Sequence, residues 1–383
     1  MFTLSPFSFT GDWLHHTAPG AYDVRLRALI VSQFAPIQLG AVLGVLAFSC
    51  AGSAGSHDTL AIGAFVAGSP VVQAGDAKLP RAHVEPREIE IPRSAGFITS
   101  GGAIAVVGYN DMRDMLEAMV SLFVAAHPKA RFELDLRGTR FAPAALAAGT
   151  SAFAPMGGEF TPQQLESYRA VARADPLLFR VAHASLSPRA LSGPLAIFVH
   201  PDNPLTSLTL TQAAQAFTGQ AARWGALGAT GAWADRPIHP YGLKPETVLG
   251  IFAKQKVLSG REFGKEFAGF PQSADVVEKL SNDTSGIGFA AANRRSASVR
   301  ALALAPRAQD EPVAPTAENM VDGRYPLDRF LLIYARRPLL PLVREFLRLV
   351  LSREGQEVVA ASPQGYLPLS AAEAAAERAK LEK

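Results

Sequence analysis

The sequence contains a single cysteine, Cys50, among its 383 residues, so no disulfide bond can form within the chain. Charged residues are also scarce, at 19%, and the formal net charge is only +3. No run of basic residues is longer than a pair such as Arg294-Arg295. Nucleic-acid-binding proteins usually carry a strong basic patch or stripe, so we predict no nucleic-acid partner.

The sequence also lacks the short motifs that mark many catalytic and metal-binding sites. Beyond residue 50 it contains no H-E-x-x-H, C-x-x-C or G-x-S-x-G motif. Its histidines, such as His127, His183, His200 and His239, are scattered among the expected ends of strands and helices. None of them forms a recognisable pair with a nucleophile. We therefore predict that the protein is not an enzyme and has no metal site and no cofactor.

Long apolar runs are rare, and the clearest one lies near the start of the chain. It spans Ile37 to Phe48, follows Arg25 and Arg27, and precedes the small residues SCAGSAGS. A basic region, a short apolar region and small residues are typical of a secretory signal. The run is too short for an ordinary membrane span. We therefore predict that residues 1–50 are a signal or export segment.

Three interpretations remain open for Cys50. It is an incidental thiol, or it becomes a lipid-carrying N-terminal cysteine, or the chain is cleaved near Ala51 or Ala54 without a lipid. Ser49 suits the position before a lipidated cysteine, whereas Ala47 occupies a place where lipoprotein signals prefer leucine. Both kinds of cleavage imply export. A lipid anchor at Cys50 is the only membrane attachment that we predict.

Residues 51–94 are rich in small residues and proline and show no lasting period, which indicates a tether. From about Ala95, short apolar runs alternate with helical patterns, which indicates an α/β protein with βαβ units. The expected strands are 103–107, 131–136, 151–155, 178–182, 194–200, 237–241, 286–289, 299–304 and 330–334. The expected helices are 112–123, 143–148, 162–172, 210–217, 248–257, 276–280, 341–351 and 354–361. Residues 371–383 are helical by propensity but have little to bury.

One stretch organises the chain, from Leu134 to Phe160. A strand ending at Leu136 leads into the turn Arg137–Arg140, and Pro143 lies in the first turn of a helix that Gly149 ends. A second strand is closed by Met156-Gly157-Gly158. A helix N-terminus flanked by glycine turns offers free backbone N–H groups, which suit an anion.

Several segments follow one another in the order found in one protein family. They are VVGYNDM at 106–112, RGTRFAPAALAAGTSAFAPMGG at 137–158, VHPDNPLTSLTLTQAAQAFTGQAARWGALG at 199–228, SGIGFAA at 285–291, YPLDRFLLIYARR at 325–337 and LSREGQEVVAASPQGYLPL at 351–369. Through them, residues 100–370 resemble the phosphate-type periplasmic solute-binding proteins of ABC importers.

This resemblance implies the type II periplasmic-binding-protein fold. That fold is α/β, with two lobes of mixed sheets flanked by helices and a ligand cleft between the lobes. The expected boundaries are 95–190 and 325–370 for lobe one, 191–324 for lobe two, and 371–383 for a C-terminal helical tail. The chain would leave lobe one near Ser187–Gly193 and return near Tyr325.

The resemblance also implies a ligand site formed by the turns 109–112, 138–141, 156–159 and 241–247. The expected ligand-binding residues are Asn110, Asp111, Thr139, Arg140, Gly157, Gly158, Lys244 and Thr247. The side chains nevertheless depart from the family pattern. The family turn Gly-Ser-Asp-Thr is here Gly108-Tyr109-Asn110-Asp111, and the family turn Met-Ser-Arg is here Met156-Gly157-Gly158.

These departures leave the ligand open. Arg140, Lys244, Thr139 and Thr247 would rebuild an anion site, since each positions a cation or a hydroxyl. Asp111 and a neighbouring Glu246 would instead suit a protonated oxyanion or an amine. Each of these residues is equally compatible with a helix cap or a solvated charge.

We predict an exported solute-binding protein that captures phosphate or a related small anion for an ABC importer. Its partners would be the small anion and the importer permease, and its location the periplasm or cell envelope. The alternative is a diverged accessory or sensor protein of the envelope that no longer binds phosphate. A hydrolase on the same fold is a third class, but it needs a nucleophile–base pair that the sequence does not show.

Overall fold

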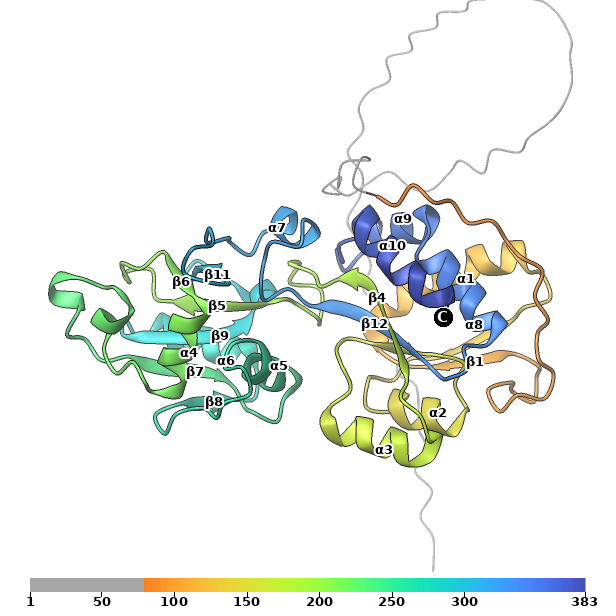
Figure 1. Cartoon of the computed structure of the whole chain (residues 1–383), viewed down its shortest axis with the longest axis horizontal. Coiled ribbons are helices and arrows are strands. Elements are labelled where there is room, and N and C mark those ends of the chain that lie inside the picture. Colours follow the sequence, from red (N-terminus) through yellow and green to blue (C-terminus); the bar gives the residue numbers. More distant parts are fainter. Residues whose placement is uncertain (1–78, 383) are drawn as a thin grey trace, which may run out of the picture. The chain divides into compact units, whose positions relative to one another are not determined.

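The computed structural model describes residues 79–382 (Figure 1). The predicted export segment, Cys50 and residues 51–78 lie outside this range. Within it, buried side chains form two large hydrophobic cores, each built on its own sheets. We call the two bodies lobe one, around Ile333, and lobe two, around Phe289. The mixed α/β architecture predicted from the sequence is confirmed.

Lobe one is built around β12 (Phe330–Ala335), which pairs antiparallel with β3 (Ala154–Met156) and β4 (Leu177–His183). Successive side chains of a strand point to opposite faces of the sheet. Ile333 therefore joins the main core of the lobe, whereas Leu332 joins a smaller cluster on the other face. This strand is buried on both sides, which explains its unbroken apolar sequence.

Helices cover both faces of the lobe-one sheet (Figure 1). Two helices form the smaller cluster, and the others pack on the main core. The helices are α1 (Arg113–Ala126), α2 (Ala142–Ala148), α3 (Pro162–Ala172), α8 (Pro341–Val350), α9 (Arg353–Ala360) and α10 (Ala371–Ala379). A parallel pair, β1 (Ile104–Val107) and β2 (Phe132–Asp135), completes the lobe.

Lobe two has a mixed sheet with the strand order β10-β5-β9-β7-β8. Its central strand, β9 (Gly286–Ala291), runs parallel to β7 and antiparallel to β5. The other strands are β5 (Leu195–Val199), β7 (His239–Leu243), β8 (Ala268–Phe270) and β10 (Arg300–Ala301), with β6 (Ser207–Thr209) and β11 (Ala303–Ala305) as a separate parallel pair. The helices are α4 (Leu210–Thr218), α5 (Val248–Lys256), α6 (Ser273–Ser281) and α7 (Ala317–Val321).

The chain passes between the lobes twice, and the two crossing segments are hydrogen-bonded to each other. Ala190 is buried in the core of lobe one and Leu195 in that of lobe two. On the return, Leu327 belongs to lobe two and Leu331 to lobe one. The N–H of Leu195 donates to the carbonyl of Leu327 at 3.0 Å. The N–H of Ala184 likewise donates to the carbonyl of Arg329 at 2.8 Å.

Helix termini follow the sequence signals in most places. Thr161 and Thr209 form capping boxes with the glutamine three residues later, at the starts of α3 and α4. Gly149 ends α2 with φ of 72°, the left-handed conformation that glycine adopts readily. A helix cap, one of the roles compatible with Asp111, is not what it forms: Met112 is the N-cap of α1, and no side-chain cap bond is made there.

The C-terminal helix α10 is helical as predicted, but the expectation that it has little to bury is wrong. Ala374 is fully buried in the core of lobe one. Glu373 Oε2 lies 3.0 Å from Nε2 of His183, whose Nδ1 lies 2.6 Å from Oδ2 of Asp328. His183 is itself completely buried. The helix is thus attached to β4 and to the returning segment through a buried histidine.

Residues 79–94 have no regular secondary structure but lie on lobe one. Arg353 donates its N–H to the carbonyl of Ala82 at 2.9 Å, and the N–H of Val84 donates to Glu354 Oε2 at 2.9 Å. This end of the predicted tether is thereby attached to α9. No helix between residues 79 and 382 is long and apolar enough to cross a membrane.

Candidate functional site

Three turns of lobe one lie side by side at the ends of β1, β2 and β3. Gly138 donates its N–H to the carbonyl of Gly108 at 2.9 Å, which joins the second turn to the first. Tyr109 donates its N–H to the carbonyl of Pro155 at 2.9 Å, which joins the first turn to the third. The structure therefore brings the predicted turns 109–112, 138–141 and 156–159 together.

A fourth segment, from lobe two, reaches the same place. A Cβ atom added to Gly158 would lie 3.0 Å from Cγ1 of Val248, the first residue of α5. A small pocket nearby has a volume of ≈ 20 Å³, enough for about one water molecule. It is lined by Glu159, Phe160 and Thr161 from lobe one and by Val248, Ile251, Phe252 and Gln255 from lobe two.

The glycine pair at 157 and 158 is needed because larger side chains from elsewhere approach its backbone. A Cβ atom at Gly157 would lie 2.5 Å from Cε1 of Tyr109 and 2.8 Å from Oγ of Ser192. A Cβ atom at Gly158 would lie 2.6 Å from Nη2 of Arg329. The missing side chains therefore make room for a tyrosine and an arginine rather than an empty space.

Tyr109 and Ser192 link the first turn to the crossing segment. The two hydroxyl oxygens lie 3.0 Å apart, and the Ser192 hydroxyl donates to the carbonyl of Gly157 at 3.1 Å. Burial is the main reason why the pKa of Tyr109 lies above its ordinary value. Its phenol therefore stays neutral and remains a hydrogen-bonding group at this position.

The carboxylate of Asp111 is engaged within the protein. Its Oδ2 accepts a hydrogen bond from the N–H of Leu191 at 2.8 Å and another from the hydroxyl of Tyr366. Burial raises the pKa of Tyr366, and the neighbouring hydroxyl of Tyr109 and carboxylate of Asp111 raise it further, so Tyr366 remains protonated. Asp111 thus ties the first turn to the crossing segment and to the segment after α9.

The hydroxyl of Thr247 is also engaged within the protein. It caps α5 by accepting from the N–H of Gly250 at 3.0 Å, and it donates to the carbonyl of Lys244 at 2.7 Å. Among residues 79–382, no hydrogen bond or ion pair joins the Lys244 side chain to the lobe-one turns. Thr247 would have to exchange these bonds to bind a ligand.

The remaining predicted residues lie at the rim. Arg140 is exposed, and its guanidinium carbon lies 4.6 Å from the centre of the Phe141 ring. Asn110 is exposed and Thr139 is half-buried. Arg140, which the sequence indicates as the strong cation of the stretch, is thus stacked on a neighbouring ring at the surface.

Arg329 was not predicted from the sequence, yet it is the buried cation of this region. It is 6% exposed, and it donates from Nη2 to the carbonyl of Gly157 at 3.1 Å and from Nη1 to that of Gly193 at 3.3 Å. Its guanidinium carbon lies 5.5 Å from the centre of the Phe252 ring. Burial lowers the pKa of Arg329, and Glu159 is the carboxylate that opposes this effect most.

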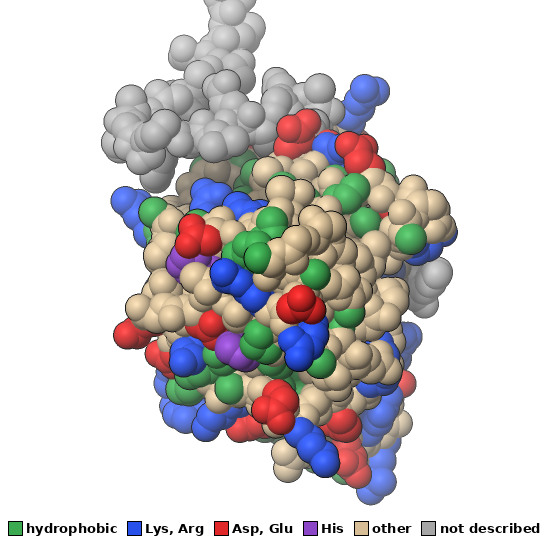
Figure 2. Space-filling view, turned by 90° about the vertical axis from the view of Figure 1, so that its left-hand side faces the viewer, with side chains coloured by type: hydrophobic (Ala, Val, Ile, Leu, Met, Phe, Trp, Pro, Cys, Tyr) green, Lys and Arg blue, Asp and Glu red, His purple; other side chains and the backbone are tan. Residues whose placement is uncertain are grey.

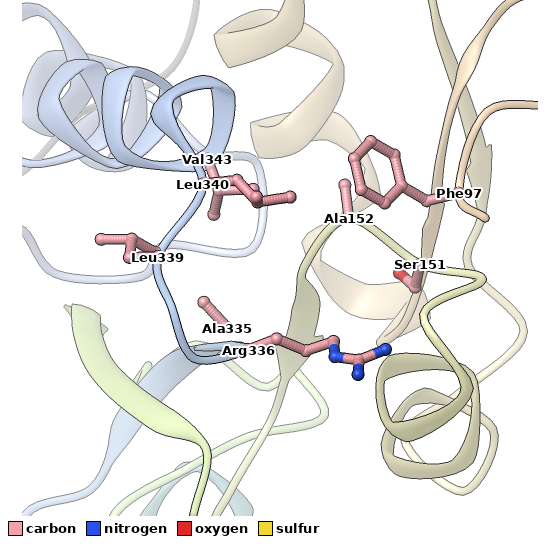
Figure 3. A pocket seen from close by; sticks show the side chains of 8 residues that line it. All are labelled: Phe97, Ser151, Ala152, Ala335, Arg336, Leu339, Leu340 and Val343. Atoms are coloured by element: carbon pink, nitrogen blue, oxygen red, sulfur yellow. The ribbon is translucent and has the colours of Figure 1, made fainter. Parts of the chain in front are cut away.

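A second pocket lies within lobe one and differs in character (Figure 3). Leu339, Leu340 and Val343 face Phe97 and Ala152 across an apolar recess of ≈ 20 Å³. Arg336 also lines it and approaches Gly149, which caps the C-terminus of α2, where a cation suits the helix dipole. This recess offers little to a polar ligand.

The face seen in Figure 2 carries acidic and basic side chains in alternation, with no large area of a single charge.

Comparisons with known proteins identify the family to which the sequence is similar. A family model described as a PBP superfamily domain matches residues 99–354. The phosphate-binding protein PstS of Pseudomonas aeruginosa is 30% identical over 302 residues, which are 76% of this chain and 89% of that protein. An ABC-type phosphate transport receptor from Vibrio cholerae has 17% identity and a TM-score of 0.49, covering 69% of this chain and 98% of its own. PstS from Borrelia burgdorferi has 17% identity and a TM-score of 0.48, with the same coverage.

Proposed function

Since the chain belongs to the PBP superfamily, and within it to the family of the phosphate-binding protein PstS, we propose that it is an exported solute-binding protein that captures phosphate for an ABC importer. The main support for this proposal is the 30% identity to PstS, a protein named for phosphate binding, over 89% of its length. The convergence of Gly108, Gly138 and Gly157 at one site supports the same proposal. We also propose that the protein binds its ligand without catalysing a reaction.

The ligand would lie between the turns 109–112, 138–141 and 156–159 of lobe one and the segment 241–248 of lobe two. We keep Asn110, Asp111, Thr139, Arg140, Gly157, Gly158, Lys244 and Thr247 as the predicted lining of this cleft. Phe252 and Val248 of α5 line the small pocket next to the turn at 157–158, and movement of α5 would enlarge it. Movement of one lobe against the other about the two crossing segments is the usual way such clefts open and close.

The periplasm or cell envelope is the proposed location, and an importer permease that recognises the closed form is the proposed partner. The predicted export segment of 1–50 supports the location, and a lipid at Cys50 would attach the protein to the membrane. Mass spectrometry of the mature protein isolated from cells would show where the chain is cleaved. A lipid mass on Cys50 would support the anchor, and a start at Ala51 or Ala54 would exclude it.

Titration calorimetry with inorganic phosphate tests the central proposal. We expect saturable binding at sub-millimolar concentration, with weaker binding of sulfate as a tetrahedral anion of different protonation. Absence of heat with phosphate and with a panel of other anions would overturn the importer function. A phosphatase assay with a chromogenic ester is the parallel test of the non-enzymatic proposal, and turnover would contradict it.

One observation favours the alternative, a diverged envelope accessory or sensor protein. Oδ2 of Asp111 and the hydroxyl of Thr247 are both hydrogen-bonded within the protein. Positions 157 and 158 also carry no side chain that could donate to an anion. If the calorimetry is silent, the same fold would serve as a protein-interaction module.

A further inference from the structure

The buried guanidinium of Arg329 raises a question that the predicted site does not answer. An arginine keeps its positive charge in proteins, and burying an unpaired charge is costly. Among residues 79–382, no carboxylate lies within ion-pair distance of Arg329. Only the neutral carbonyls of Gly157 and Gly193 accept hydrogen bonds from its guanidinium within this range.

The guanidinium of Arg329 also has a hydrogen-bond donor without a partner among the described residues. Its Nε is buried and has no hydrogen-bond partner within the described residues. Most buried polar groups in proteins are paired, so an unpaired donor on a buried cation indicates a partner that is absent from this conformation. A guanidinium offers parallel donors that match the oxygens of a tetrahedral oxyanion.

The guanidinium of Arg329 lies beside the glycine turn, which has no charged side chain of its own. Nη2 of Arg329 lies 2.6 Å from where a Cβ atom of Gly158 would be. We propose that Arg329 is the principal cation of the anion site, and that it supplies from the returning crossing segment a positive charge that the glycine turn itself does not have.

This proposal rests on the proposed function and names the group that recognises the ligand. In the present conformation the aromatic ring of Phe252 on α5 lies against the guanidinium. Outward movement of α5 would uncover Arg329, and the oxyanion would take the place of the ring. Nε and Nη2 would then donate to two oxygens of the same anion.

The test compares two arginines that both hold backbone carbonyls. Arg300 of lobe two donates from Nη2 to the carbonyls of Asn203 and Leu205, and serves as the control. We expect R329Q to lose phosphate affinity by at least about 100-fold, since charge-assisted hydrogen bonds to an anion are strong. R300Q should lower the melting temperature while affinity changes by less than about threefold.

A transplanted arginine separates ligand binding from a structural role. Neither Gly157 nor Gly158 has a positive φ, so the backbone at 158 accepts a side chain. The double variant Gly158→Arg with Arg329→Ala places a cation in the turn and removes the closer of the two crowding atoms, Nη2 of Arg329 at 2.6 Å; Cγ1 of Val248, at 3.0 Å, would shift with α5. We expect it to bind phosphate at least about tenfold more tightly than R329A alone. A role confined to holding Gly157 and Gly193 would leave the two variants equal.

The outcomes distinguish this proposal from the proposed function. If wild-type protein binds no anion, both are overturned. If wild-type protein binds phosphate and folded R329Q binds it equally well, only the role of Arg329 is overturned. If R329Q does not fold, a crystal structure of wild-type protein with phosphate decides. An oxygen about 2.7–2.9 Å from Nε supports the proposal, and a phosphate remote from Arg329 overturns it.

Discussion

Nδ1 of His183 lies 2.6 Å from Oδ2 of Asp328, so a completely buried histidine on β4 is bonded to the segment that returns to lobe one. Burial is the largest influence on this histidine and lowers its pKa. The hydrogen bonds to Asp328 and Glu373 outweigh burial and raise the pKa of His183 to about 9. The buried imidazole is therefore charged at neutral pH, between two carboxylates.

This arrangement predicts a stability that declines in alkali. Because the folded pKa of His183 lies above its ordinary value of 6.5, its contribution is complete below pH 6.5. It is lost as the pH rises through about 9. We expect wild type to lose on the order of a few kcal/mol of unfolding free energy across this interval, relative to H183Q.

The measurement is urea denaturation at a series of pH values. H239Q is the matched control, since His239 also pairs with an aspartate, Asp283 at 2.7 Å, but is largely exposed. H239Q should follow the wild-type pH profile. A wild-type profile parallel to that of H183Q would show that His183 is not charged in the folded protein.

Glu373 carries the contact between α10 and the buried histidine, and its replacement should loosen that helix. It also accepts from the N–H of Ser370 at 3.0 Å in the capping box of α10. We expect E373Q to lower the free energy of unfolding by about 1–3 kcal/mol at pH 7. Hydrogen exchange of α10 amides should accelerate in E373Q and not in E382Q, because Glu382 is exposed. Unchanged exchange would contradict the attachment of α10 through His183.

The contact between Tyr109 and Gly157 predicts energetic coupling. G157S should destabilise the protein by about 1–3 kcal/mol, because its Cβ would meet the Tyr109 ring. Y109S should also be destabilising, since it removes a buried ring. The double variant should cost less than the sum of the two, because each change makes room for the other. Chemical denaturation of the four proteins gives the coupling energy, and additivity would contradict this packing.

Thr247 is predicted to stabilise α5 whether or not it binds a ligand. T247A should cost about 1 kcal/mol, the usual effect of removing a helix N-cap, and T209A should cost a similar amount at α4. Only T247A should also weaken phosphate binding if its hydroxyl reaches the ligand. Calorimetry on the two variants at equal stability separates the roles. Equal affinities of T247A and T209A would exclude Thr247 from the site.

The charges of Arg140 and Lys244 are predicted to contribute only weakly to phosphate affinity. Both are exposed, and exposed charges are weakened by solvent and salt. We expect R140A and K244A to reduce phosphate affinity by only a few-fold at low salt and hardly at all at high ionic strength. Complete loss of binding in R140A would instead assign to Arg140 the contact that we propose for Arg329.

Local signals in the sequence predicted much of the fold because they act over a few residues. Thr161 and Thr209 each precede a helix with glutamine three positions later, and Gly149 follows one. The short strands β6 and β8 and the helix α7 were missed, since three to five residues carry no periodic pattern. The family resemblance, which depended on the order of motifs, is confirmed.

The site was less predictable because its contacts join distant parts of the chain. Asp111 looks like a helix cap from its neighbours, but its partners Leu191 and Tyr366 are far away in sequence. Arg329 follows an aspartate and precedes a buried strand, which is the usual pattern of a solvated strand end. Only the fold reveals that Gly157 and Gly158 leave space beside it.

Asp328 and Arg329 are consecutive, and they serve different ends of lobe one. Asp328 is bonded to His183 and through it to α10, whereas Arg329 reaches Gly157 in the cleft. One peptide unit therefore connects the C-terminal helix with the proposed anion site. We therefore expect a tag or fusion placed after α10 to change the affinity for the ligand. Binding measured on C-terminally tagged protein would then include the effect of the tag.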